Sequence, residues 1–208
     1  MSDRPEGRFA EVTGALLLGG ASRRMGRDKA ALPVEGVPLA TRLARLLDDL
    51  FEEVLLVGGA PPPGTPGRRV EDPEGPRCAL RGLVAALEAA RSPRVLVVAT
   101  DLVALTPDLL LALLAAPEAD VVVPEAKGEL QPLCALYRRD AVLPVARANL
   151  AAGKLAVRAV FDAAEVQRLT GPDLAAVDPD GTALLNANTP EELARAEARV
   201  AEAAGRVR

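Results

Sequence analysis

Glycines and cations crowd one short segment near the start of the chain, in a pattern suited to binding phosphate. Glycine lets backbone N–H groups approach phosphate oxygens closely, and arginine and lysine neutralise the phosphate charge. The spacing matches neither the P-loop nor the dinucleotide-binding glycine pattern, and a basic surface turn is the alternative interpretation. The candidate ligands of an anionic group are Gly19, Gly20, Ser22, Arg23, Arg24, Gly26 and Lys29.

A single aspartate follows the clearest apolar segment of the chain. Asp101 comes directly after RVLVVAT, residues 94–100. The carboxyl end of a buried strand faces the ligand crevice of an α/β protein, and a carboxylate there can hold Mg²⁺ beside phosphates. The alternative is a turn aspartate that precedes a helix starting at Pro107, with Thr106 as its N-cap.

Two of the three asparagines of the chain, Asn186 and Asn188, are separated by one residue near the C-terminus. In an extended segment the side-chain alternation places both on the same face, as in a binding site. The following Thr189-Pro190-Glu191-Glu192 is also explained as the capped start of a helix.

Three further residues are weaker candidates. Asp72, after a short apolar segment, could contact the base or ribose of a nucleotide, and a solvated turn is the alternative. Gln131 could line a second-substrate site, although strand packing explains it equally simply. Arg81 could lie near the same crevice, but an arginine on the outer face of a helix is the simpler interpretation.

The apolar pattern predicts the elements that must position these groups. Strands are expected at 12–18, 53–57, 69–71, 94–100, 120–124, 131–137 and 183–185. Helices are expected at 39–50, 79–90, 107–116, 140–152, 155–164 and 190–204. Strands and helices alternate at spacings typical of βαβ units, which predicts an α/β protein with a mostly parallel sheet, in which 131–137 could be antiparallel. We expect one domain over 1–208 with a flexible N-terminus at 1–11.

Composition excludes several classes of function. The chain has no histidine, so histidine-based triads, general bases and metal ligands are absent, and Cys78 and Cys134 lie too far apart in sequence to form a zinc site between them. Aromatic residues are 2% of the chain and the net charge is -4, which argues against nucleic acid as a partner. A polar N-terminus and the lack of a long apolar run predict a cytoplasmic protein without a membrane partner.

The ordered set of these motifs resembles the molybdenum cofactor guanylyltransferase family of the nucleotidyltransferase superfamily. The segment LLLGGASRRMGRDKAAL, residues 16–32, is similar to the nucleotide-binding signature of that family. The similarity continues through most of residues 13–195. It includes Gly36-Val37-Pro38-Leu39, Glu71-Asp72, Gly75-Pro76, Gly82, Thr100-Asp101, Gln131-Pro132, Ala135-Leu136-Tyr137 and Asn186-Ala187-Asn188-Thr189-Pro190-Glu191-Glu192-Leu193.

The resemblance implies a Rossmann-like, three-layer nucleotidyltransferase fold, and GTP and molybdenum-bearing molybdopterin as substrates, with pyrophosphate released and Mg²⁺ as cofactor. It also leaves room for transient partners that deliver or accept the cofactor. By the same resemblance, Leu17, Leu18 and Gly19 contact the guanine nucleotide, Lys29 binds phosphate and Asp72 the nucleotide. Asp101 binds Mg²⁺, Lys29 and Asp101 act in catalysis, and Asn186 and Asn188 form the active-site floor. Departures from the family pattern are Leu18 for alanine, Leu102-Val103-Ala104 for a more polar stretch, and Gln131 for a common histidine.

The implied reaction is compatible with a chain that lacks histidine. A phosphate monoester has a second pKa of about 6, so it is already an anion at neutral pH and attacks without a general base. Three alternatives stay open: a CTP-dependent enzyme acting on the same pterin, a sugar-phosphate or alcohol-phosphate nucleotidyltransferase, and a non-catalytic nucleotide-binding regulator or carrier. The Gly19-Gly20 pair favours GTP over CTP by resemblance.

Overall fold

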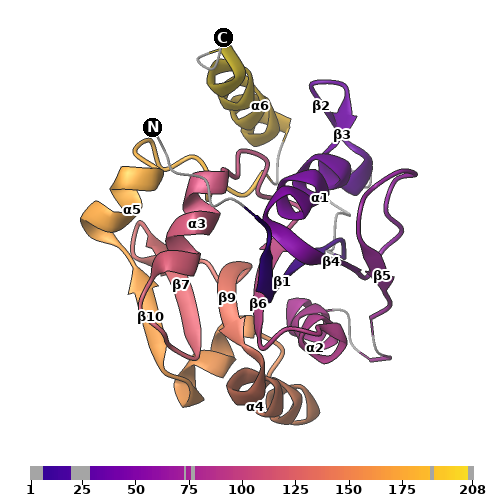
Figure 1. The fold of residues 1–208 in the computed structure, drawn as a ribbon, viewed down its shortest axis with the longest axis vertical. Coiled ribbons are helices and arrows are strands. Elements are labelled where there is room, and N and C mark those ends of the chain that lie inside the picture. The colour runs from indigo at the N-terminus through magenta and orange to yellow at the C-terminus, as the bar shows by residue number, and fades with distance from the viewer. Residues whose placement is uncertain (1–6, 20–28, 73, 76–77, 188–189, 206–208) are drawn as a thin grey trace.

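The structure is a computed structural model that describes residues 7–19, 29–72, 74–75, 78–187 and 190–205. Its main sheet has eight strands, seven of them in the order β10-β7-β9-β6-β1-β4-β5, with β8 paired to β7 (Figure 1). Pairing is parallel except along β9, which runs antiparallel to β6 and β7, and at β8. The strands are β1 (Phe9–Leu17), β4 (Phe51–Val57), β5 (Arg68–Val70), β6 (Arg94–Ala99), β7 (Val121–Ala126), β8 (Glu129–Leu130), β9 (Cys134–Arg138) and β10 (Val166–Leu169).

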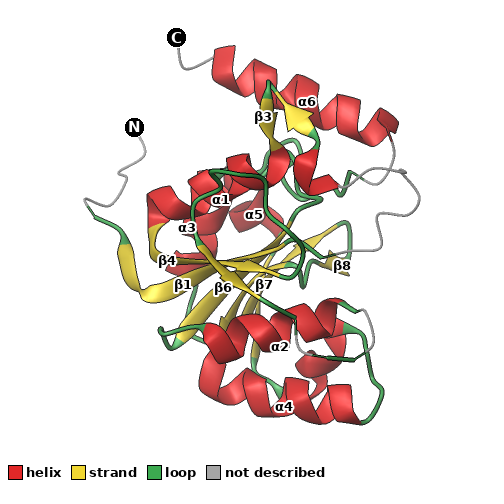
Figure 2. Ribbon diagram, turned by 90° about the vertical axis from the view of Figure 1, so that its right-hand side faces the viewer, coloured by secondary structure: helices red, strands yellow, loops and turns green. Residues whose placement is uncertain are grey.

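Helices cover both faces of the sheet and give three layers (Figure 2). One layer contains α1 (Leu39–Leu50), α3 (Pro107–Ala115) and α5 (Gly171–Val177), with α6 (Pro190–Gly205) packed beyond them. The other layer contains α2 (Ala79–Ala89) and α4 (Arg139–Ala151). The remaining elements are the 3₁₀ helices η2 (Lys29–Ala31) and η3 (Val157–Ala163) and the small hairpin of β2 (Pro33–Val34) and β3 (Val37–Pro38).

The central strands are apolar on both faces because a helix layer buries each face. In β1 and just beyond it, Val12, Leu16 and Leu18 pack into the core on the α1 side. The intervening Ala15 and Leu17 pack into the core on the α2 side. This double burial explains why the strand appears in the sequence as an unbroken apolar run.

The predicted α/β class and mostly parallel sheet are confirmed, and β9 is antiparallel as anticipated. The Thr106 cap is also confirmed, since its hydroxyl accepts a hydrogen bond from the Leu109 N–H at 3.4 Å. Thr189 lies outside the described residues. The hairpin β2–β3, the strands β8 and β10 and the helix α5 were not predicted.

Three expectations are wrong. The strand expected at 183–185 is a turn, because Asp178 Oδ1 accepts the N–H groups of Thr182 and Ala183 and curls the backbone. The helix expected at 155–164 is only the 3₁₀ segment η3, preceded by an exposed loop. Residues 9–11, expected to be flexible, belong to β1.

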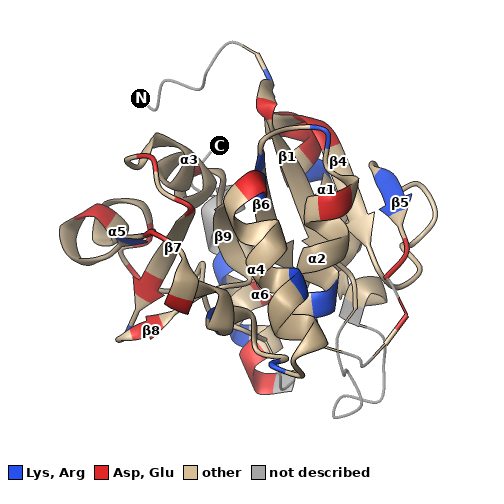
Figure 3. Ribbon diagram, turned by 90° about the horizontal axis from the view of Figure 1, so that it is seen from below, with Lys and Arg blue, Asp and Glu red and all other residues tan. Residues whose placement is uncertain are grey.

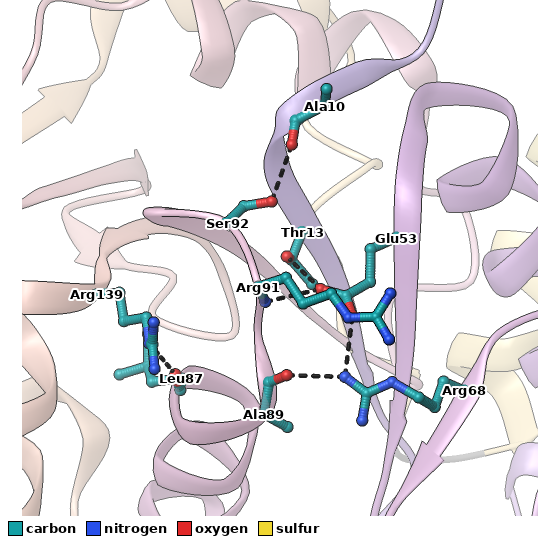
Figure 4. Close-up of polar contacts among 9 residues, drawn as sticks. All are labelled: Ala10, Thr13, Glu53, Arg68, Leu87, Ala89, Arg91, Ser92 and Arg139. Carbon is teal, nitrogen blue, oxygen red and sulfur yellow. Dashed lines mark hydrogen bonds and ion pairs between the residues drawn. The ribbon is translucent and has the colours of Figure 1, made fainter.

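Glu53 joins several elements at the edge of the sheet where the parallel strands begin (Figure 4). Its carboxylate accepts hydrogen bonds from the Thr13 hydroxyl at 2.8 Å, the Arg91 backbone N–H at 2.9 Å and the Arg68 guanidinium at 2.9 Å. Arg68 also donates to the carbonyl of Ala89 at the end of α2. Burial raises the pKa of Glu53, but these hydrogen bonds outweigh burial and the pKa is lowered overall.

We predict that Glu53→Gln lowers the free energy of unfolding by about 1–2 kcal/mol at pH 7, because hydrogen bonds to a charged group are the stronger class. The lowered folded-state pKa makes the ionised form a source of stability above the ordinary value of about 4.5. That contribution is lost as pH falls through the folded-state value. Urea unfolding of both proteins at pH 7 and pH 3 measures the difference, which should shrink at pH 3. An equal difference at both pH values would contradict the prediction.

Candidate functional site

The parallel strands β1, β4, β5 and β6 end at one edge of the sheet, and the polar candidates follow those ends. Leu17 of β1 pairs with Val57 of β4 on one side and with Ala99 of β6 on the other. Val57 in turn pairs with Val70 of β5. The register therefore sets the segments that follow these strands side by side at this edge, which is where α/β proteins bind ligands.

The Asp72 carboxylate lies beside three glycines: Gly19 after β1, Gly58 after β4 and Gly82 in α2. A Cβ atom on Gly58 would lie 3.1 Å from Asp72 Oδ2 and 3.2 Å from Oδ1. A Cβ atom on Gly19 would lie 3.6 Å from Oδ2, and one on Gly82 would lie 3.9 Å from Oδ1. The absence of side chains at these positions makes room for the carboxylate between β1, β4 and α2.

The turn after β4 requires glycine for a second reason. Gly58 and Gly59 have φ values of +69° and +45°, a region that L side chains rarely adopt. A Cβ atom on Gly59 would lie 3.0 Å from Leu18 Cβ, and the Leu18 N–H donates to the Val57 carbonyl at 2.8 Å. The glycine pair therefore lets this turn approach the end of β1 closely.

Arg81 of α2 completes this part of the site. Its Nη2 donates to Asp72 Oδ2 at 3.0 Å, and its Nη1 donates to the carbonyl of Gly75. Both side chains are largely buried, with 12% of Arg81 and 24% of Asp72 exposed. Neither this ion pair nor the role of Gly58 was predicted; the sequence signals were a double glycine directly after a strand and an arginine beside Gly82.

Asp101 lies beyond the end of β6, next to the asparagine segment. The Ala187 N–H donates to the Asp101 carbonyl at 2.9 Å, which brings neighbouring Asn186 to the same edge of the sheet. Asn186 is exposed, and Oδ1 of Asp101 is shielded from solvent. Asn188 lies outside the described residues.

Gln131 lies in the turn that leads into β9, and its carbonyl accepts the Cys134 N–H at 2.9 Å. The Ala99 N–H donates to the Leu133 carbonyl at 2.9 Å, so the turn lies against the end of β6. The buried Tyr137 hydroxyl donates to the Pro132 carbonyl, and burial raises the tyrosine pKa. Residues 131–133 are therefore a fixed turn at the candidate site and not the start of the strand.

The predicted phosphate-binding segment is described only at its two ends, at Gly19 and at the backbone of Lys29. Gly20, Ser22, Arg23, Arg24 and Gly26 lie outside the described residues. Lys29 begins η2, and its side chain is also outside what the structure describes. The neighbouring Ala30 is buried in the core on the α1 side, which anchors the end of the glycine-rich segment.

The side chains available as metal ligands determine how the expected Mg²⁺ could be held. The described residues contain no group of three histidine, cysteine or carboxylate side chains that could hold a metal ion. Mg²⁺ commonly uses one or two protein carboxylates together with substrate phosphates and water, so Asp101 alone fits an ion that arrives with a triphosphate. The two cysteines are free, and burial raises the pKa of Cys134 to about 12, so this thiol is no nucleophile.

A separate cleft of about 640 Å³ runs along α1 and reaches α6. Its lining includes Val34, Arg42, Leu105, Asp180 and Val200, and none of Gly19, Asp72 or Asp101. Burial lowers the pKa of Arg42, whose guanidinium donates to the Val103 carbonyl at 2.8 Å. The cleft is therefore distinct from the polar edge of the sheet.

Figure 3 views the molecule from the side that carries α2 and α4. Basic and acidic segments are interspersed over the ribbon on this side (Figure 3). No helix among the described residues combines the length and apolar character needed to cross a bilayer.

Comparison with known proteins first defines the class. Residues 14–169 match the model of the MobA-like NTP transferase domain. The fold resembles molybdopterin-guanine dinucleotide biosynthesis protein A from Archaeoglobus fulgidus, with a TM-score of 0.74, 21% identity and coverage of 91% of this chain and 99% of that one. It also resembles 2-C-methyl-D-erythritol 4-phosphate cytidylyltransferase from Thermus thermophilus, with a TM-score of 0.67, 20% identity and coverage of 90% and 98%. These matches define a nucleotidyltransferase with the three-layer, Rossmann-like fold.

Sequence relatives give the particular family. A probable molybdenum cofactor guanylyltransferase from Chloroflexus aggregans is 36% identical over 88% of this chain and 91% of its own length. A molybdenum cofactor guanylyltransferase from Desulfosudis oleivorans is 33% identical over 94% and 98%. The chain therefore belongs to the molybdenum cofactor guanylyltransferase family, and the resemblance found in its motifs is confirmed.

We predict that Gly58→Ala displaces Asp72 and weakens nucleotide binding by about tenfold, since an unpaired polar contact costs roughly 1–3 kcal/mol. Because φ is positive at residue 58, the alanine also lowers the free energy of unfolding by about 1–2 kcal/mol. Gly64→Ala is the matched control, because Gly64 also has positive φ but a Cβ there meets nothing within 4 Å. Thermal unfolding and GTP titration of both variants measure the two effects. Equal nucleotide affinities in the two variants would show that Gly58 contributes only backbone freedom.

Proposed function

We propose that this chain transfers GMP from GTP to molybdenum-bearing molybdopterin, forming the guanine dinucleotide form of the cofactor and releasing pyrophosphate. The observation that carries the proposal is the convergence of Gly19, Asp72 and Asp101 at one edge of the sheet, in a chain of this family. A glycine loop suits the triphosphate, and two carboxylates on either side suit the nucleoside and the metal-bound phosphates.

The reaction is a substitution at the α-phosphorus of GTP. An oxygen of the pterin phosphate forms a bond to that phosphorus, the bond to the bridging oxygen of the β-phosphate breaks, and pyrophosphate leaves. The attacking phosphate is already anionic at neutral pH, so the chain must mainly position both substrates and neutralise charge. Bound Mg²⁺ would supply further neutralisation of the triphosphate.

Within this proposal each predicted residue has a role. Leu17, Leu18, Gly19 and Asp72 hold the nucleoside, and the glycine-rich segment with Lys29 binds the phosphates. Asp101 holds Mg²⁺, with the ion's other ligands supplied by phosphate oxygens and water. The Gln131 turn and the Asn186 segment both lie near the end of β6, and we assign Gln131, Asn186 and Asn188 to the pterin side of the site.

The alternative functions differ in the nucleotide that is used, in the acceptor, or in whether any transfer reaction takes place. A single assay separates them: the protein is incubated with molybdenum-bearing molybdopterin, Mg²⁺ and each nucleoside triphosphate, and the dinucleotide product is identified by mass spectrometry. We expect a guanine dinucleotide and stoichiometric pyrophosphate. Equal or faster turnover of CTP would overturn guanylyl transfer and leave the nucleotidyltransferase class intact.

The matched variant in the same assay is Asp101→Asn, which keeps the size of the side chain and removes its charge. We expect transfer to fall by about two orders of magnitude or more, since each 1.36 kcal/mol on the barrier is tenfold in rate. A Mg²⁺ titration and a thermal melt accompany the assay. Parent-like Mg²⁺ dependence would place the metal elsewhere, and a collapsed melting temperature would make Asp101 a structural residue.

A further inference from the structure

Arg81 is placed where an arginine is locally unfavourable. It is the third residue of α2, and a cation in the first turn of a helix opposes the helix dipole. Its Nε is also shielded from solvent and makes no hydrogen bond within the described residues. Leaving a buried N–H group without an acceptor has an energetic cost, so the contacts that Arg81 does make must justify its position.

Those contacts converge on the nucleotide edge of the sheet. One guanidinium nitrogen donates to Asp72 Oδ2 at 3.0 Å, and a second donates to the carbonyl of Gly75 in the loop between β5 and α2. Within the described residues Asp72 Oδ1 accepts no hydrogen bond. Arg81 therefore fixes one carboxylate oxygen of Asp72. The glycines beside Asp72 have no side chains, so no side chain contacts the carboxylate from those positions.

We infer that Arg81 is a positioning residue for nucleotide selection: it holds Asp72 so that the other carboxylate oxygen accepts a hydrogen bond from the bound nucleotide. The inference rests on the proposed function, because it takes Asp72 to be a nucleotide ligand. Arg81 itself need not touch the nucleotide. It acts by limiting the orientations of the Asp72 side chain before binding, so less freedom is lost when the nucleotide arrives.

The chemistry of a carboxylate defines what it recognises. A carboxylate oxygen only accepts hydrogen bonds, so its partner on the nucleotide must be a donor. Guanine offers N–H donors, including its 2-amino group, and the ribose offers hydroxyl donors. ITP lacks the 2-amino group and dGTP lacks the 2′-hydroxyl, so a loss of discrimination against one of them identifies the missing group as the donor.

The test measures the equilibrium binding of GTP, ITP and dGTP, each in the presence of Mg²⁺. The proteins are the full chain, the single variants Arg81→Met, Arg81→Lys and Asp72→Asn, and the double variant Asp72→Asn/Arg81→Met. We expect Arg81→Met to weaken GTP binding about tenfold and to reduce its discrimination against either ITP or dGTP. Arg81→Lys should recover part of that discrimination, because lysine keeps the charge but lacks the planar fork. The double variant should bind GTP within about twofold of Asp72→Asn, because Arg81 acts through Asp72.

Arg68→Met is the matched control. Like Arg81, Arg68 pairs with a carboxylate and donates to a backbone carbonyl, but at the opposite edge of the sheet. It should lower the melting temperature and leave all three affinities at parent values. The inference is overturned if Arg81→Met binds GTP like the parent, or if the loss of affinity caused by Arg81→Met is just as large in the Asp72→Asn background.

These binding measurements need no pterin, so their outcome does not depend on whether the proposed transfer reaction occurs. If the assay of the preceding subsection shows that CTP is the nucleotide used, guanylyl transfer is wrong, and the same variants are titrated with CTP and dCTP. A dependence of CTP binding on Arg81 that is lost with Asp72→Asn would support the positioning role. Binding of CTP that ignores both residues would overturn it.

Discussion

The Asp72 carboxylate occupies space that a side chain on Gly58 would need, and much of the architecture around the site follows from this contact. A Cβ atom at Gly58 would lie 3.1 Å from the carboxylate, so the position directly after β4 favours a residue without one. The same turn has positive φ at two successive residues, which carries it close to Leu18 at the end of β1. Close packing of three strand ends thereby holds an acidic group beside the glycine-rich segment.

The two edges of the parallel sheet use polar groups in opposite ways. At the edge where the strands begin, Glu53 receives hydrogen bonds from Thr13, Arg68 and Arg91 and ties strands and loops together. At the edge where they end, Asp72 and Asn186 keep exposed surface, and the asparagine segment is hydrogen-bonded to the Asp101 backbone. Satisfied polar groups stabilise the fold, whereas groups with remaining hydrogen-bonding capacity are available to a ligand.

Elements with a strong local pattern were predictable from the sequence. α1 was predicted at its observed bounds because its apolar residues recur at helical spacing, and the central strands were found because burial on both faces makes them continuous apolar runs. The turn at 182–185 was missed because a side chain seven residues before Leu185, that of Asp178, shapes it. Arg81 was interpreted as a residue of the outer helix face because helical spacing carries no information about a carboxylate nine residues earlier.

The central claim is that the nucleotide lies across the carboxyl ends of β1, β4, β5 and β6. A crystal structure of the chain with Mg²⁺ and a non-hydrolysable GTP analogue tests this claim most directly. We expect a donor of the nucleoside within hydrogen-bond distance of Asp72, and the phosphates over the end of β1, between Gly19 and Asp101. A nucleotide bound instead in the cleft between α1 and α6, with no contact to Asp72, would contradict it.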